Sequence, residues 1–272
     1  MIDFKLLSAR KELFARVTGV KLAEFLKIVE KVRPLWDKML AKKKCHGRNS
    51  NLKILENEIL MAILYYRYYT SHYFLGMQFN LDASNVCRHI QRLEPLLASA
   101  VSLNKERNFS EKDLQILIDA TEIQTQRPSK NQKKFYSGKK KKHTQKVEIM
   151  TDLNGKILCI SKGYPGRTHD FKVRKQSSKI PKNVTVLADS GYQGLQKIHE
   201  NTVLPFKRRR KCPLTAEQKA HNSALSSKRV VIEHTFAQLK KFKILGSVYR
   251  NFQKKLHLRF NIIAGVYNLR FA

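Results

Sequence analysis

Apolar residues in the first third of the chain recur at three- and four-residue steps, the spacing of amphipathic helices. Residues 4–42 predict helix that breaks or restarts at Pro34, because proline lacks the N–H that a helix interior needs. A second helix is predicted at about 54–69. The two stripes contain Phe14, Val17, Leu22, Phe25, Leu26, Val29 and Val32 in the first, and Ile59, Leu60, Ile63 and Leu64 in the second.

Two shorter helical segments, about 71–78 and 83–97, have the spacing of a helix-turn-helix. Asp82 is the expected N-cap of the second segment, whose buried stripe begins at Val86. Its polar residues are then expected to point outward: Asn85, Arg88, His89 and Arg92. Arginine and asparagine can read guanine and adenine in the major groove, so this face is a candidate DNA-binding surface. An ordinary helix pair with a solvated face is the alternative.

Beyond a polar linker near 104–112 the pattern changes to strands. Apolar runs at 114–123, 146–153, 156–162 and 184–189 predict four strands, with a hairpin turn at 152–155. We expect a short helix at 168–176, a helical stretch near 193–200, a short strand at 203–206, and helices at 214–243 and 253–270. The chain is therefore predicted to hold two domains, a helical region at 1–104 with a helix-turn-helix at about 54–97, and a mixed α/β domain at 105–272.

The net charge of +33 is concentrated in the second predicted domain. Residues 105–272 hold 37 Lys and Arg against 12 Asp and Glu, whereas residues 1–104 hold 17 against 9. A folded domain this basic indicates nucleic acid, and less often an anionic membrane, as its partner. The basic runs at 139–142 and 207–211 are either solvated loops or a track for phosphates, with Lys207, Arg208 and Arg209 as candidate contacts.

Neither a membrane nor an oxidising compartment is expected. No apolar run approaches the roughly 18–20 residues of a spanning helix, and the first residues lack the order of a signal peptide. The four cysteines are far apart and form no Cys-x-x-Cys pair: Cys45, Cys87, Cys159 and Cys212. These features predict a cytoplasmic protein, and a chain this basic would associate with the nucleoid in a bacterium.

Three isolated acids stand out in this basic chain. Asp119 and Asp189 each end an apolar run, and Glu233 is the one carboxylate after position 218, in a stretch with eleven Lys and Arg. Carboxylates suit hard cations, so we expect these acids to bind Mg²⁺ or Mn²⁺, two ions in one site. The plainer alternatives are strand-end turn residues for the aspartates and, for Glu233, an i,i+4 pair with Arg229.

The helix around Glu233 places two cations beside it. Arg229 and Lys240 lie four residues before and seven residues after Glu233, and at about 100° per residue all three share one face. We expect this face to present a metal ligand between two groups that grip phosphates.

These segments resemble the three catalytic blocks of DDE transposases. The blocks are Ile118–Glu122, Leu187–Gly194, and Arg229–Glu233 with Lys240. The closest branch is the insertion sequence five group, akin to the Harbinger transposases. The likeness extends over nearly the whole chain, through Gly166–Asp170, Gly47–Arg48, Phe74–Gly76 and Ser84–Arg88. One departure is Ser226, where related elements carry a tyrosine.

The resemblance implies a ribonuclease-H-like core with Asp119, Asp189 and Glu233 as ligands of two magnesium ions. It implies a homodimer or higher assembly that binds terminal inverted repeats, cleaves at the element ends and joins the 3′ hydroxyls to target DNA. His169 and Asp170 are secondary candidates; capping of the following helix is the favoured role of Asp170, and Glu122 is read as structural or solvent-facing. A nuclease without strand transfer, a domesticated non-catalytic DNA-binding protein and a basic nucleic-acid chaperone are the alternatives.

Overall fold

The computed structural model describes residues 2–42, 52, 54–103, 115–177, 179–208, 213–251 and 254–271, which form two compact units. One, the helical unit, comprises residues 1–102, 239–247 and 258–272. The other, the sheet unit, comprises residues 103–238 and 248–257. The predicted linker, Arg209, Gly47, Arg48, Cys45 and Cys212 lie outside the described residues.

The first part of the helical unit departs from the single broken helix predicted for residues 4–42. Three helices form there: α1 (Phe4–Ser8), α2 (Lys11–Thr18) and α3 (Leu22–Ala41). The chain turns at Gly19, whose φ of 76° favours glycine. Pro34 lies inside α3, so the prediction of a break there is wrong. Burial of Ile28, Val32 and Trp36 on both sides of the proline explains why the helix continues.

Three helices build the predicted helix-turn-helix region: α4 (Leu55–Tyr68), α5 (His72–Phe79) and α6 (Ala83–Val101). The Ser71 hydroxyl caps α5 by accepting from the Phe74 N–H at 3.2 Å. After α5 the chain turns through Asn80 (φ 53°) and passes so close to Gly76 that a Cβ there would lie 2.2 Å from the Leu81 carbonyl oxygen. Asp82 occupies the N-cap position of α6, although its side chain makes no capping hydrogen bond.

The end of the chain completes the helical unit. The helix α10 (Lys243–Gly246), most of α11 (Leu256–Asn268) and the 3₁₀ turn η4 (Leu269–Phe271) belong to it. Gly265 of α11 lies against the end of α6, since a Cβ there would come within 1.6 Å of the Val101 carbonyl oxygen. The predicted division, which gave all residues after 104 to the second domain, therefore differs from the structure for these C-terminal segments.

The sheet unit contains one mixed sheet of seven strands. Its strands are β1 (Gln115–Gln124), β2 (Tyr136–Ser137), β3 (Lys142–Thr151), β4 (Ile157–Ile160), β5 (Tyr164–Pro165), β6 (Thr185–Ala188) and β7 (Thr202–Val203). The order is β2-β3-β1-β6-β7, with β4 and β5 also paired to β3. The pairings of β3 are antiparallel, and those of β6 with β1 and β7 are parallel.

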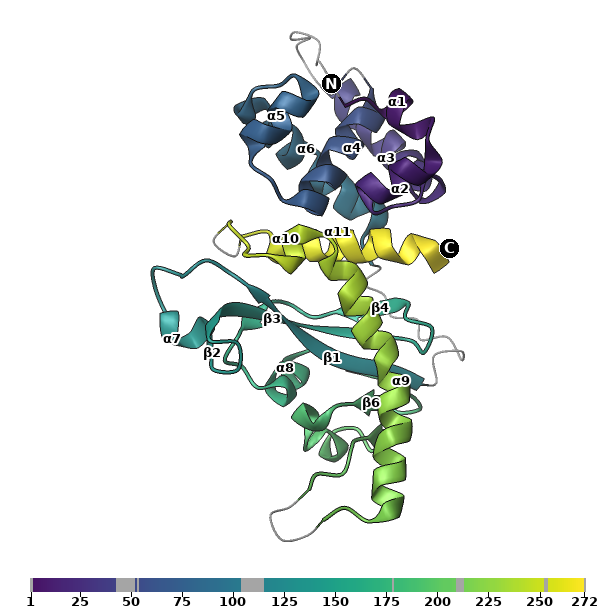
Figure 1. Cartoon of the computed structure of the whole chain (residues 1–272), viewed down its shortest axis with the longest axis vertical. Helices are drawn as coiled ribbons and strands as arrows, with labels where there is room; N and C mark the ends of the chain where they lie inside the picture. The colour runs from purple at the N-terminus through teal and green to yellow at the C-terminus, as the bar shows by residue number, and fades with distance from the viewer. Residues whose placement is uncertain are drawn as a thin grey trace. The chain divides into compact units, whose positions relative to one another are not determined.

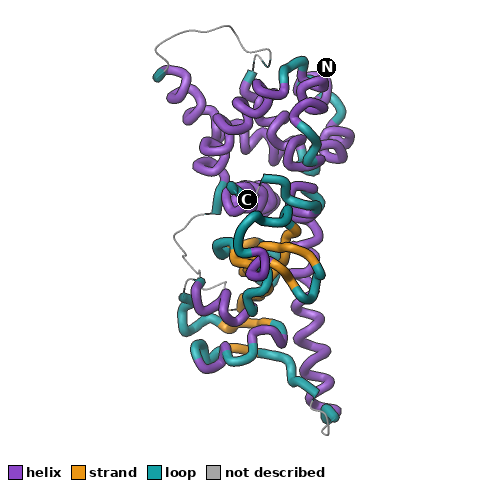
Figure 2. The backbone as a smooth tube through the Cα atoms, turned by 90° about the vertical axis from the view of Figure 1, so that its left-hand side faces the viewer, coloured by secondary structure: helices purple, strands orange, loops and turns teal. Residues whose placement is uncertain are grey.

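Helices flank this sheet, as Figures 1 and 2 show. They are α7 (Gln132–Phe135), α8 (Asp170–Gln176), the 3₁₀ turns η2 (Ser190–Tyr192) and η3 (Leu195–Lys197), and the long α9 (Ala216–Lys240). The helix predicted at 193–200 is only the short 3₁₀ turn η3 in the structure. The strand predicted at 203–206 is the two-residue strand β7, which begins one residue earlier. A mixed sheet with flanking helices confirms the predicted ribonuclease-H-like core.

The order of contacts along α9 explains how it crosses the sheet. Asn222 bonds both backbone groups of Phe206 after β7, Arg229 meets Asp119 on β1, and the Thr235 hydroxyl reaches the Gly155 carbonyl in the β3–β4 turn at 3.4 Å. A core that contains Ile116, Ile118, Val186, Ala188 and Tyr192 fixes β1 beside β6. Together these contacts set the positions of the acids relative to α9. No helix among the described residues is long and apolar enough to cross a bilayer.

Candidate active site

Asp119 and Asp189 are brought together by the parallel pairing of β1 and β6. The last register pair joins Ile118 to Ala188, so that the two aspartates follow it on neighbouring strands. Asp189 leaves the end of β6, as predicted. Asp119 instead lies in the middle of β1, because β1 continues to pair with β3 as far as Gln124. The predicted strand 114–123 therefore continues past Asp119, and the alternative that Asp119 is a strand-end turn residue is wrong, although the neighbouring strand does end beside it.

Each aspartate is oriented by its own backbone. Asp119 Oδ1 accepts from the Ala120 N–H at 2.7 Å, and Asp189 Oδ1 accepts from the Gly191 N–H at 2.7 Å. The other oxygen of Asp119 lies 3.4 Å from an Arg229 nitrogen on α9. Gly191 has no room for a side chain, since a Cβ there would lie 2.7 Å from Asp170 Oδ2 and 2.9 Å from Asp189 Oδ1. Asp170 and Asp189 thus meet at the β6–η2 turn, beside the neighbouring strand that carries Asp119.

Burial and the neighbouring carboxylates disfavour the ionised form of Asp119. Desolvation raises the pKa of Asp119 to about 6, and the negative charges of Asp189 and Asp170 act in the same direction. The Ala120 N–H and the Arg229 guanidinium oppose this increase in the pKa without cancelling it. Crowded, partly desolvated oxygen ligands are what a divalent cation neutralises, so Asp119 and Asp189 fit Mg²⁺ or Mn²⁺.

Glu233 stands apart from the two aspartates in this structure. It lies one helical turn after Arg229 on α9 but remains exposed, and it makes no hydrogen bond or ion pair with the described residues. No three His, Cys, Asp or Glu side chains in the described part of the chain form a group that could hold a metal. The predicted three-ligand site is therefore not assembled in this structure. The role of Glu233 as a metal ligand stays a prediction.

The secondary candidates fall into an adjacent ion-pair network. Lys146 Nζ lies 2.7 Å from Asp170 Oδ1 and 3.8 Å from Glu122 Oε1, and its side chain is 11 % exposed. Asp170 is the first residue of α8 and His169 the N-cap position, with no capping bond from the His169 side chain. The favoured capping role of Asp170 is therefore replaced by an ion pair with Lys146. Glu122 is structural, as expected, because it accepts from the Thr144 hydroxyl at 2.8 Å.

A buried network near the acids was not predicted from the sequence. Arg174 of α8 lies 2.7 Å from Glu148 Oε1, and both side chains are at most 5 % exposed. Burial, together with the charges of Glu148 and the three aspartates, raises the pKa of Tyr192 well above its usual range. The one available signal was Glu148 itself, a charged residue between the apolar Val147 and Ile149 of the predicted strand 146–153.

The candidate DNA-reading face of α6 divides into two parts. Arg88 is exposed and donates to Asn85 Oδ1 at 2.9 Å, so these two residues form a polar pair on the outer surface. His89 and Arg92 instead contact the buried Glu58 of α4, at 2.7 Å and 2.8 Å. The Arg92 guanidinium also lies 4.9 Å above the Trp36 ring. The prediction that His89 and Arg92 point outward is wrong, since they pair with a carboxylate that packing has buried.

The remaining basic candidates are exposed where the structure describes them. Lys207 and Arg208 follow β7, and Lys240 is the last residue of α9. Ser226, where related elements carry a tyrosine, is exposed on α9, three residues before Arg229. None of these positions contradicts a phosphate-contacting role, which stays a prediction.

Comparisons with known proteins agree with this arrangement. Residues 118–268 match the model of the DDE superfamily endonucleases, and residues 51–102 match the helix-turn-helix of that superfamily. A protein of Microchaete diplosiphon named "Probable transposase for insertion sequence element IS702" is 39 % identical over 98 % of this chain and 97 % of its own length. A protein of Streptomyces albus G, likewise named as a transposase, for insertion sequence element IS112, is 26 % identical over 70 % of this chain and 71 % of its own. No solved structure matches the chain. The matched catalytic region and the full-length relative place this chain in the family of DDE superfamily endonucleases.

Proposed function

We propose that this chain is the transposase of an insertion sequence. It would bind the terminal inverted repeats of the element, cleave phosphodiester bonds at its ends and join the freed 3′ hydroxyls to target DNA. The observation that carries the proposal is the position of Asp119 and Asp189 on neighbouring strands, directly after the register pair Ile118–Ala188, with the Arg229 guanidinium 3.4 Å from Asp119. The family and the printed names of the relatives support the same conclusion.

The residues at this site suit phosphoryl transfer. Asp119 and Asp189 would hold the divalent ions, and Glu233 would complete the ligand set from α9, one turn after Arg229. The ions would activate a water or a hydroxyl and stabilise the leaving oxygen. Arg229 is placed to grip a phosphate beside the aspartates, since guanidinium groups bind phosphate in a bidentate manner. One such site serves both cleavage and joining, because each is a displacement at phosphorus.

The helical unit would supply the sequence preference. The partly exposed Asn85 and the exposed Arg88 form a hydrogen-bonded pair on α6 and have the chemistry that recognises adenine and guanine. Two element ends must be held together for a concerted reaction, so we expect a homodimer or a higher assembly on DNA. Lys207, Arg208, Arg209 and Lys240 would contact the phosphate backbone, which makes binding strongly dependent on salt.

The decisive experiment is cleavage of a duplex taken from the DNA that flanks the coding region, with Mg²⁺ present. We expect Asp189→Asn to lower the cleavage rate by about 100- to 1,000-fold, the loss typical for removing a group that stabilises transition-state charge. Glu200→Gln is the matched control, because it removes an exposed carboxylate from the same unit and should cleave like the wild type. Cleavage by Asp189→Asn at the wild-type rate would exclude this site.

A second assay separates the transposase from a ribonuclease-H-like nuclease that only hydrolyses. A duplex with a pre-cut end supplies the 3′ hydroxyl, and a labelled plasmid serves as target DNA. Joined products are expected for the wild type and should be lost in Asp189→Asn. Hydrolysis without any joined product would favour the nuclease, and absence of both activities would favour a domesticated DNA-binding protein.

A further inference from the structure

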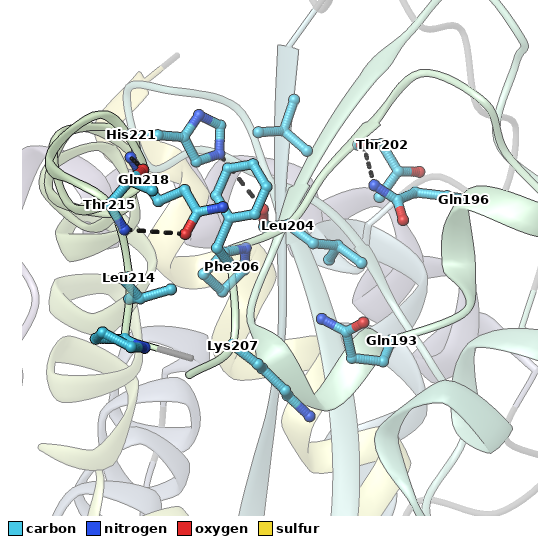
Figure 3. A pocket seen from close by; sticks show the side chains of 13 residues that line it. Gln193, Gln196, Thr202, Leu204, Phe206, Lys207, Leu214, Thr215, Gln218 and His221 are labelled. Atoms are coloured by element: carbon cyan, nitrogen blue, oxygen red, sulfur yellow. Dashed lines mark hydrogen bonds between the residues drawn. The ribbon is translucent and has the colours of Figure 1, made fainter. Parts of the chain in front are cut away.

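A pocket of about 730 Å³ lies in the sheet unit, between the segment after β7 and the first turns of α9. Figure 3 shows its side chains, with the rings of Phe206 and His221 close together and Gln193 on another wall. Its lining residues are Gln193, Gln196, Thr202, Val203, Leu204, Pro205, Phe206, Lys207, Pro213, Leu214, Thr215, Gln218 and His221.

The pocket opens at the same edge of the sheet as the two aspartates. β6 and β7 run parallel, with Leu187 paired to Val203, so Asp189 and Phe206 both follow strands that end at this edge. Neighbouring strands lie about 4.8 Å apart, so β7, which leads into the pocket, lies about 10 Å from β1, the strand that carries Asp119. At a rise of about 3.4 Å per nucleotide, a DNA strand with a phosphate at the aspartates would have a base two or three nucleotides away beside the pocket.

Phe206 is exposed yet rigidly held. Its side chain is 48 % exposed. Its backbone N–H donates to Asn222 Oδ1 at 2.8 Å, its carbonyl accepts from Asn222 Nδ2 at 3.0 Å, and its ring centroid lies 5.1 Å from that of His221 at an angle of 68°. A large apolar ring that is fixed in place without being buried gains little from packing. This arrangement is suited to a planar ligand that covers the free face of the ring.

The polar groups around the ring match a nucleotide. The Gln193 amide makes no hydrogen bond with the described residues and offers both a donor and an acceptor, as the edge of a nucleobase requires. Lys207 adds a positive charge next to the ring and likewise pairs with none of the described acids. Aromatic stacking, an amide and a cation are the combination by which proteins bind unpaired bases and their phosphates.

We propose that this pocket binds an unpaired nucleobase of the DNA strand close to the cleaved phosphate, stacked on Phe206 and contacted by Gln193. The inference rests on the proposed function for the origin of the DNA strand. It assigns a further role to Phe206 and Gln193, which is to hold the strand open beside the aspartates. Removing a base from the duplex costs about a few kcal/mol of lost stacking and pairing, and the contacts in the pocket would offset this cost.

Binding of a single strand to the full-length protein tests this proposal. The probe is a fluorescein-labelled thymidine oligonucleotide of about 12 nucleotides, within the site sizes of single-strand binders, with a duplex of the same length for comparison at one salt concentration. Phe206→Ala should raise the Kd for the single strand about tenfold, the effect of removing one base–aromatic stacking contact. The Kd for the duplex should change less than about twofold, and Phe206→Trp should restore single-strand binding.

Tyr136→Ala is the matched control. Tyr136 is also exposed, also forms an edge contact with a histidine (His143, centroids 5.6 Å apart at 73°), and also precedes a basic run, but it is not among the residues that line the pocket. Equal effects of Tyr136→Ala and Phe206→Ala on the single strand would overturn the proposal. Loss of cleavage in Asp189→Asn, with single-strand binding unchanged in Phe206→Ala, would retain the proposed function and remove the base pocket. Circular dichroism of each variant confirms that the fold is retained.

Discussion

The two units of this protein differ in how closely a buried carboxylate is paired with an arginine. In the helical unit Glu94 is fully buried, and its Oε1 lies 2.6 Å from Arg259 Nε. The same oxygen accepts a hydrogen bond from the Tyr66 hydroxyl at 3.4 Å. In the sheet unit Asp119 is partly buried among other carboxylates, and the nearest arginine nitrogen lies 3.4 Å away. A buried acid with a close arginine is a structural element, whereas acids that crowd one another without a sufficient counter-charge are candidates for a functional site.

The comparison holds inside the sheet unit as well. Glu148 has Arg174 at 2.7 Å and is almost inaccessible to solvent, although it lies near the aspartates. Burial raises the pKa of Glu148, and the Arg174 charge counteracts that increase. In a chain with net charge +33, cationic side chains are abundant, so a cluster of acids without full compensation supports the proposed binding of a divalent cation.

The largest expected effect on stability comes from breaking the structural pair. Glu94→Gln leaves the Arg259 guanidinium buried without its counter-charge, which should lower the free energy of unfolding by about 3–5 kcal/mol. Thermal unfolding followed by circular dichroism measures this loss. Glu12→Gln is the control, because its ion pair with Arg16 is 92 % exposed on the glutamate side and should contribute less than about 0.5 kcal/mol. Similar melting temperatures for both variants would contradict the structural role of Glu94.

In metal-free protein we expect Asp119→Asn to raise the free energy of unfolding, the opposite of the effect of Glu94→Gln. The pKa of Asp119 is raised in the folded state, so its ionisation destabilises the fold above pH 6, and this cost disappears as the pH falls from about 6 toward the unfolded value near 4. At pH 8 the variant should gain up to about 3 kcal/mol, and much less at pH 4. Melting temperatures at both pH values, with EDTA present, measure the difference. A gain that does not depend on pH would contradict the assigned cause.

Divalent ions should stabilise the wild type selectively. At a Mg²⁺ concentration one hundredfold above the Kd, the free energy of unfolding should rise by about 2.7 kcal/mol. The increase should be absent in Asp119→Asn and present in Glu200→Gln, whose carboxylate lies outside the site. Differential scanning calorimetry with and without Mg²⁺ distinguishes these cases. An equal increase in all three proteins would indicate general ion effects and remove the metal assignment.

The smallest effects concern the two arginines of α6. Arg92→Ala removes a partner of the buried Glu58 and should lower the free energy of unfolding by about 1–3 kcal/mol. Arg88→Ala should leave stability within about 0.5 kcal/mol, because Arg88 is exposed, and should lower the preference for the element end over unrelated duplex. Competition binding at fixed salt measures that preference. An exchange of the two phenotypes would show that Arg92, rather than Arg88, reads DNA.

Much of the fold could be predicted because it is encoded locally. The three- to four-residue spacing located α4, α5, α6 and α9, and the apolar runs located β1, β3, β4 and β6. The turn at Gly155 was signalled by its sequence and has a φ of 89°. The acids were found by their isolation among basic residues, and the pairing of β1 with β6 brings two of them together.

The sequence by itself determined most of the longer helices and strands and singled out Asp119 and Asp189 as candidate ligands. Only the tertiary structure decided that His89 and Arg92 pair with Glu58, that Glu94 meets an arginine 165 residues later, and that α11 completes the helical unit. Periodicity is a property of neighbouring residues, so it is visible along the chain. The partner of a buried charge is chosen by packing between distant segments, which no local pattern records.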